Sequence, residues 1–260
     1  MTTINKSLAY SADTLVYNNE CELLWPEEGP DPYNPLNLQP NTVRVRTSDG
    51  AVPKKSSSTS YETATLVEGT SDVYDVYKSG TDFTFLLIDS RNIVEVLGAN
   101  TTGITNMTGM FNFCTSLKTV ALFDTSSVTD MHTMFNYCSL LTSVPLFDTS
   151  SVTNMQFMFY NCSSLTTVPL FDTSNVTNIE YMFNNCSSLT TVLLFNTSSV
   201  VFMAGMFENC KNVQSGALAL YRQASTQANP PSKHTGTFKN CGANTTTGAA
   251  ELAQIPSDWK

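Results

Sequence analysis

The middle of the chain repeats one pattern of apolar and polar positions every 24 residues. A typical unit covers residues 152–175, and the next unit follows at once with no slip in register. Apolar side chains recur three or four positions apart over 152–165, a spacing that places them on one face of a short helix. Residues 168–171 then alternate between two faces, as in a short strand. Each unit is therefore predicted to contain one short helix and one short strand.

A single unit of this size cannot bury its apolar face, so neighbouring units must stack on one another. The sequence thus predicts an α+β fold, namely a right-handed leucine-rich-repeat-like solenoid of 24-residue repeats with a small β unit at its N-terminal end. Equivalent apolar residues form columns inside the predicted stack. The core residues we expect are Cys114, Cys138, Cys162, Cys186, Cys210, Phe135, Phe159, Phe183, Leu165 and Leu189.

The segments outside the repeats suggest how the stack is closed at its two ends. Cys241 follows Cys210 by 31 residues instead of 24, which indicates a capping unit with an insertion. We expect an N-terminal segment and Pro-rich linker at 1–41, a β-rich unit at 42–88, the solenoid at 89–216 and the C-terminal cap at 217–260. Strands in the β-rich unit are expected at 42–47, 63–67, 72–78 and 82–88.

Two further columns are candidates for ligand binding. The first consists of Phe123, Phe147, Phe171 and Phe195. Strict alternation aims these rings away from the core, where they form an apolar stripe suited to sugars or peptide side chains. In the alternative arrangement the turn folds each ring inside, because an exposed ladder of four phenylalanines promotes aggregation. Both arrangements stay open from the sequence.

The second column consists of Asp124, Asp148 and Asp172, with Asn196 in the next repeat. Stacked carboxylates repel one another unless they are capped or share a cation. Hydrogen bonds within the Asp-Thr-Ser turns explain the column better than calcium does, because Asn196 interrupts it. We therefore predict no metal at these residues.

Charge and composition exclude several classes of function. Acidic residues outnumber basic ones 22 to 13, which opposes phosphate binding and makes nucleic acid an unexpected partner. No apolar run is long enough for a secretory signal or for insertion into a membrane. His132 and His234 are the two histidines, and no catalytic nucleophile with its base can be assembled around either. We expect no enzyme activity and no cofactor.

The run Phe-Asp-Thr-Ser-x-Val-Thr-x-Met-x-x-Met-Phe-x-x-Cys-x-x-Leu stands at 147–165 and recurs at 171–189, with Ile179 in place of the first methionine. This run resembles the BspA-like bacterial surface-protein repeat family, a treponemal-type branch of the leucine-rich repeats. Members of that family are typically secreted or anchored to a surface and are associated with adhesion. The resemblance therefore implies an extracellular or surface-exposed binding protein.

Two functions follow as expectations. The first is a non-enzymatic adhesion module that binds a protein or carbohydrate receptor on another cell. The alternative is a bacteriophage tail or fibre protein with a structural or receptor-binding role, because similar repeats joined to N-terminal units without a signal look like such proteins. The chain would then be part of a virion, released by lysis, and would form a homo-oligomer within a fibre.

Overall fold

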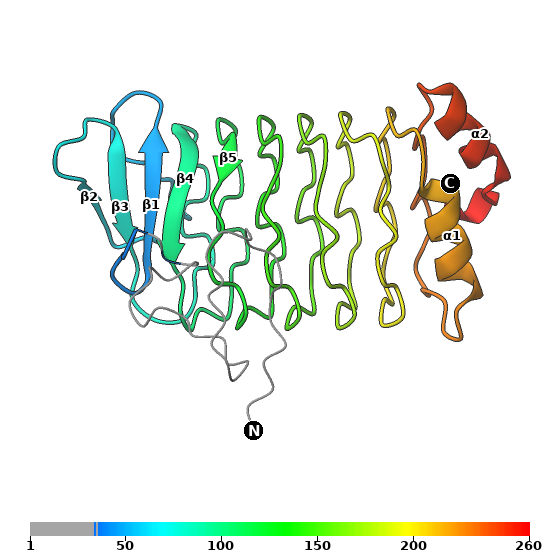
Figure 1. Ribbon diagram of the computed structural model, residues 1–260, viewed down its shortest axis with the longest axis horizontal. Helices are drawn as coiled ribbons and strands as arrows, with labels where there is room; N and C mark the ends of the chain where they lie inside the picture. Colours follow the sequence, from blue (N-terminus) through cyan, green and yellow to red (C-terminus); the bar gives the residue numbers. More distant parts are fainter. Residues whose placement is uncertain (1–33, 35) are drawn as a thin grey trace, which may run out of the picture.

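The computed structural model describes residue 34 and residues 36–260, so most of the predicted N-terminal segment lies outside the described residues. Figure 1 shows a row of stacked coils with a β-sheet at one end and two helices at the other. One continuous apolar core extends through the sheet, the coils and the first helix, from Val43 to Trp259. The sheet and the helices thus cover the two apolar ends that a stack of coils would otherwise expose.

The sheet joins the N-terminal part of the chain to the coils. Its strands are β1 (Thr42–Thr47), β2 (Thr63–Leu66), β3 (Val73–Tyr77), β4 (Ile93–Asn100) and β5 (Thr119–Val120), in the order β2-β3-β1-β4-β5. β1 pairs antiparallel with β3 and with β4, whereas β4 pairs parallel with β5. Val43, Val45 and Val76 are fully buried. The N-terminal strands therefore share the sheet and the core of the first coils.

The strand predicted at 82–88 is wrong, because this segment already has the hydrogen bonds of a coil. Phe83 N–H donates to Asn106 O at 2.8 Å, and Phe85 N–H donates to Thr108 O at 2.9 Å. Leu86 N–H bonds back to Phe83 O, and Phe85 has a positive φ of 52°. Tight turns of this kind cannot belong to an extended strand. The coil pattern consequently begins near residue 82.

The helix predicted in each repeat is also wrong. Phe135 N–H donates to Met158 O in the next coil at 2.9 Å, whereas an α-helix would direct it to the carbonyl four residues earlier. Met134 N–H instead closes a tight turn onto Met131 O. Thr133 and Tyr137 have positive φ values, which interrupt any right-handed helix. Alternate amides thus bond to the neighbouring coil, and the apolar side chains still reach the core.

The step between coils is visible in the backbone pairing. Parallel bridges join Asn106 to Asp130, Asp130 to Asn154, and Asn154 to Asn178. Side chains reinforce the same step: Thr153 Oγ1 donates to Thr129 O across 24 residues, and Thr177 Oγ1 donates to Thr153 O. Much of the serine and threonine of the repeats therefore holds one coil to the next.

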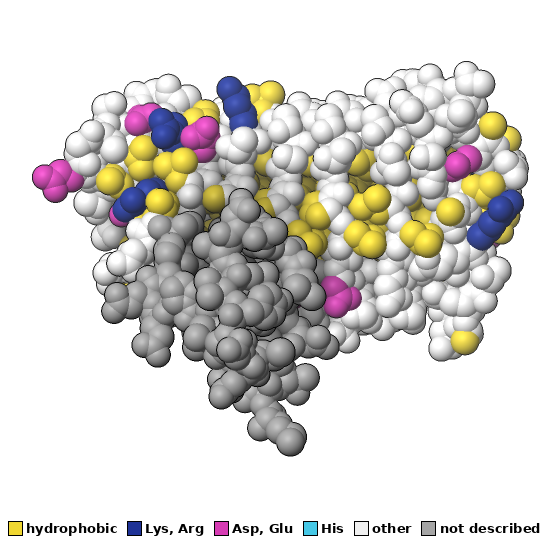
Figure 2. Space-filling model, viewed as in Figure 1, with side chains coloured by type: hydrophobic (Ala, Val, Ile, Leu, Met, Phe, Trp, Pro, Cys, Tyr) yellow, Lys and Arg dark blue, Asp and Glu magenta, His cyan; other side chains and the backbone are white. Residues whose placement is uncertain are grey.

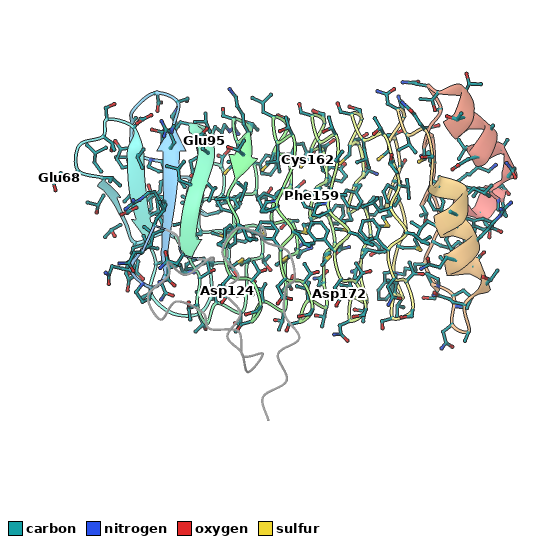
Figure 3. All side chains as sticks on the ribbon, in the orientation of Figure 1. Glu68, Glu95, Asp124, Phe159, Cys162 and Asp172 are labelled. Carbon is teal, nitrogen blue, oxygen red and sulfur yellow. The ribbon has the colours of Figure 1, made fainter. Side chains whose placement is uncertain are left out.

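The core is built around a continuous column of phenylalanine rings. The rings of Phe111, Phe135, Phe159, Phe183, Phe207 and Phe238 follow one another with centroids 5.2–6.1 Å apart and nearly parallel planes. Phe159 lies in the interior of the stack in Figure 3. The ten residues expected in the core are all buried. Stacking of rings one coil apart therefore runs through the whole repeat region.

The C-terminal cap continues the stack for one irregular coil and then closes it. Lys233 pairs with Phe202 across the insertion that contains α1 (Ala217–Thr226). After α2 (Thr246–Gln254) and the short helix Ser257–Trp259, the Trp259 ring lies 6.3 Å from the last ring of the column, Phe238. Trp259 is 4% exposed, so it covers the end of the apolar column.

Replacing Leu165 with alanine tests this packing. Leu165 is fully buried, so Leu165→Ala should lower the free energy of unfolding by about 2–5 kcal/mol. Leu170→Ala in the same repeat is the matched control, because Leu170 is 57% exposed and its loss should change stability by less than about 0.5 kcal/mol. Urea unfolding of both variants measures the difference. Equal stability of the two variants would contradict the packing.

Candidate functional site

The phenylalanine column predicted as a ligand-binding stripe lies inside the molecule. Phe123, Phe147, Phe171 and Phe195 are each at most 2% exposed. A tight turn explains the difference: Phe171 N–H donates to Pro169 O at 3.0 Å, two residues earlier, and Phe147 N–H bonds to Pro145 O in the same way. This turn breaks the alternation by one position. The exposed phenylalanine stripe is therefore wrong, and the inward arrangement is the one observed.

The same kind of turn places a leucine on the surface of three successive coils. Leu146, Leu170 and Leu194 stand at the tips of successive turns and are 58%, 57% and 55% exposed. We call these three residues the leucine ridge. Pro145 and Pro169 lie beside it and are partly buried. Figure 2 shows a band of hydrophobic side chains running along the coils on the visible face. A straight apolar row on the repeats thus exists, but it is made of leucine.

The aspartate column caps turns, as the sequence indicated. Asp124 Oδ1 accepts from Ser126 N–H at 2.9 Å, and Asp172 Oδ1 accepts from Ser174 N–H at 2.9 Å. Asn196 Oδ1 accepts from Ser198 N–H in the same geometry. Figure 3 shows Asp124 and Asp172 at one edge of the coils. Because an amide performs the same role as a carboxylate here, the column needs no cation.

The cysteine column is buried and consists of free thiols. Cys162 Sγ donates to Phe135 O at 3.1 Å, and Cys186 Sγ donates to Phe159 O at 3.1 Å. Each thiol therefore bonds to a backbone carbonyl of the preceding coil. Burial raises the pKa of these thiols well above their ordinary value, and it raises the pKa of Cys241 to about 12. The column holds coils together and presents no reactive thiolate.

A partly exposed aromatic cluster is a feature that the sequence reasoning missed. The rings of Phe157 and Tyr181 stack with centroids 5.0 Å apart and an angle of 8° between their planes. Tyr160 packs edge-on against Phe157 at 5.4 Å. Neighbouring coils continue the cluster, since Phe113 stacks on Tyr137 at 4.5 Å. Aromatic rings that remain partly exposed on a rigid scaffold are typical of binding surfaces.

A groove of about 440 Å³ lies beside this cluster. Phe157, Tyr160 and Tyr181 form its aromatic wall. Its polar lining consists of Asn184, Asn185, Glu208 and Asn209. We call the space between these seven residues the aromatic groove. It is a shallow depression that is open to solvent, and its lining combines apolar and hydrogen-bonding groups, as the linings of ligand sites do.

The backbone explains why these side chains lie on the surface. Phe157 and Tyr181 occupy a column in which every coil has a positive φ, and the other members include Gly109, Thr133 and Gly205. The residue type changes from coil to coil, unlike the invariant core columns. That variation was a signal in the sequence that this position faces outward. The left-handed backbone conformation of Phe157 and Tyr181, whose rings stack on each other, has no comparable signature in the sequence.

No arrangement in the described part of the chain suggests catalysis. No cluster of three or more His, Cys, Asp or Glu side chains there could hold a metal ion. The His234 ring stacks on Trp259 at 4.2 Å and is hydrogen-bonded to Asp258, so it belongs to the cap. No described helix has the length and apolar character needed to cross a membrane. The expectations of no enzyme activity and no cofactor stay predictions.

Stacked coils around one buried apolar core define a repeat protein, and its repeated sequence resembles the BspA-like repeats. The chain belongs to the family described as "Mycoplasma protein of unknown function, DUF285", which matches residues 82–170 and 163–228, together more than half of the chain. The match begins where the coil pattern begins. A leucine-rich repeat protein from Eubacterium ventriosum, whose crystal structure is known, has 22% sequence identity to this chain, and the two structures align with a TM-score of 0.33. That alignment covers 51% of this chain and 43% of the other. No curated protein matches the sequence.

The burial of the cysteines predicts how the protein responds to thiol reagents and to alkali. In a Cys21→Ser variant, the six described cysteines should not react with a thiol reagent until the protein unfolds. The unfolded chain ionises its thiols first as the pH rises through their ordinary pKa, near 9. The free energy of unfolding should therefore fall with increasing pH above about 9. Rapid modification of the native protein would contradict this account of the column.

Proposed function

We propose that the protein is a non-enzymatic binding module displayed at a surface, and that the leucine ridge docks a partner protein. The observation that supports this proposal is the exposure of Leu146, Leu170 and Leu194 by more than half, in consecutive coils. Leaving one large apolar side chain in water is ordinary, but a row at equivalent positions forms a continuous patch. Such patches are typical of protein interfaces.

The chemistry of the ridge favours a protein partner over a glycan. Aliphatic side chains bury well against other apolar side chains, whereas sugar recognition relies on aromatic rings and oriented polar groups. Half-buried Pro145 and Pro169 beside the ridge restrict the backbone at its edge. Little conformational entropy should be lost when a partner covers a surface that is already rigid.

The coils behind the ridge also support a binding role. Thr149 Oγ1 donates to Asp172 O at 2.8 Å and Thr173 Oγ1 donates to Asn196 O at 2.7 Å, which joins the turns that follow the ridge. Repeats that bond to their neighbours in this way present a long, preformed surface. The matching family is described as one of unknown function, so it identifies no ligand. The resemblance of the repeat to BspA-like surface-protein repeats favours the same class of function.

Substituting the ridge tests the proposal. The triple variant Leu146→Ser/Leu170→Ser/Leu194→Ser should keep its melting temperature while its attachment to bacterial or epithelial cells falls by about tenfold or more, as for hot-spot residues. Leu140→Ser is the matched control, because Leu140 is 44% exposed but stands outside the ridge. Flow cytometry with the labelled protein measures attachment. If the folded triple variant attaches as well as the wild type does, the ridge is not the docking surface.

The place of display is a separate question, and we propose the cell surface with a virion as the alternative. Both places use the same fold and the same ridge. Fractionation of a producing culture distinguishes them: recovery in the cell envelope, without association with particles, supports the cell surface. Recovery in purified virions would instead show a bacteriophage tail or fibre protein, and a trimer by light scattering would favour a fibre.

A further inference from the structure

The aromatic groove is built from different repeat positions than the leucine ridge, and its chemistry is different. Its wall consists of Phe157, Tyr160 and Tyr181, all partly buried, so each ring is held by neighbours while part of it faces solvent. From these rings and the polar groups opposite them, we infer that the groove is a binding site for a neutral saccharide. This site does not depend on the proposed role of the ridge.

The aromatic wall is held rigidly, as recognition of a sugar ring requires. Phe157 and Tyr181 support each other in a parallel stack, and Tyr160 meets Phe157 at an angle of 69°. The wall therefore has two orientations of aromatic surface within one groove. One face of Phe157 and one face of Tyr181 cover each other in this stack, so the C–H groups of a pyranose ring would pack against the aromatic surface that the stack leaves exposed.

Some polar side chains of the groove already have hydrogen-bond partners, and others are free to bond to a ligand. Glu208 Oε2 accepts from Asn184 Nδ2 at 3.1 Å, and Asn209 Oδ1 accepts from Asn240 Nδ2 at 2.9 Å. In contrast, the hydroxyls of Tyr160 and Tyr181 have no hydrogen-bond partner among the described residues. A saccharide hydroxyl both donates and accepts, so it can bond to a tyrosine hydroxyl and to a fixed carboxylate at once.

The side chain of Asn185 adds a further available group, since it too has no hydrogen-bond partner within the described part of the chain. Its amide can donate and accept simultaneously, which matches a pair of neighbouring sugar hydroxyls. Asn185 has a positive φ of 61°, a backbone conformation that asparagine tolerates better than most residues. A turn, and not a helix or a strand, thus places Asn185 in the lining of the groove.

The charge of the groove favours a neutral ligand. Glu208 is the one carboxylate in its lining, and Glu208 Oε1 lies 2.8 Å from Lys239 Nζ. This pairing offsets the negative charge, and it raises the pKa of Lys239 through the hydrogen bond and the attraction of Glu208. A paired charge attracts neither anions nor cations strongly. Sulfated or phosphorylated ligands should therefore bind less well than uncharged sugars.

Gly205 controls the position of the Tyr181 ring. A Cβ atom at Gly205 would lie 2.3 Å from Cε1 of Tyr181, so the ring rests directly against the glycine. Alanine would displace the ring, but it should not prevent folding, because the same column holds Thr133 and Phe157 at positive φ. Gly109 has the same relation to Phe85 at 2.3 Å, in a coil away from the groove. Gly109→Ala is therefore a matched control for Gly205→Ala.

Isothermal titration calorimetry with the purified full chain tests the site. The probes are neutral oligosaccharides of glucose, mannose, galactose and N-acetylglucosamine, with a heparin fragment and a proline-rich peptide as comparison ligands. We expect at least one neutral oligosaccharide to bind. Tyr181→Ala should weaken that binding by about tenfold or more, and Tyr181→Phe, which keeps the ring stack, should weaken it less.

The controls separate loss of the site from loss of the fold. Gly205→Ala should weaken saccharide binding, whereas Gly109→Ala and the triple substitution of the leucine ridge should leave it unchanged. Melting temperatures are measured for every variant, and Tyr181→Phe keeps the test valid if Tyr181→Ala unfolds. The inference is overturned if no neutral oligosaccharide binds, if Tyr181→Phe and Gly205→Ala both bind like the wild type, or if the groove binds heparin or the peptide instead.

Discussion

The structure depends on one constraint: each coil must satisfy its backbone amides by bonding to the coil beside it. Phe135 N–H bonds to Met158 O and Phe159 N–H bonds to Met182 O, so equivalent residues are brought into register one repeat apart. Once that register is set, the Phe111-to-Phe238 ring column and the buried thiols follow, because identical side chains stack on identical side chains. A repeat that lost these bonds would leave buried polar groups unpaired, at a cost of about 1–3 kcal/mol each.

The same constraint decides which residues are free to bind a ligand. The hydroxyls of threonines such as Thr153 and Thr177 donate hydrogen bonds to the neighbouring coil. Many of the polar side chains on the surface therefore have a structural role. The aspartate column is used in the same way, as a set of turn caps. What remains are positions that the coil contacts do not use: the leucine ridge, and the variable left-handed column that carries Phe157 and Tyr181. Both surfaces are available for binding because the backbone groups behind them are already hydrogen-bonded to neighbouring coils.

The sequence predicted the repeat, its length and its core columns, because identical burial in every coil leaves an invariant apolar residue. It did not predict the local backbone. Apolar spacing of three and four residues over 152–165 is shared by a helix and by a chain of tight turns. The hydrogen bonds to the next coil and the positive φ at Phe157 and Asn161 distinguish the two. In the same way, the turn from Phe171 to Pro169 moves Leu170 outward by one position against simple alternation. The aromatic groove was missed for this reason, since it depends on where the turns lie.

Alternate amides of the repeats bond to the next coil and not within a helix. Scalar couplings across hydrogen bonds, measured by NMR on the deuterated protein, report the partner of each amide directly. The structure predicts a coupling from Phe135 N to the carbonyl carbon of Met158, and from Phe159 N to that of Met182. Couplings from these two amides to carbonyls four residues earlier in the chain would show helical repeats and would contradict the account.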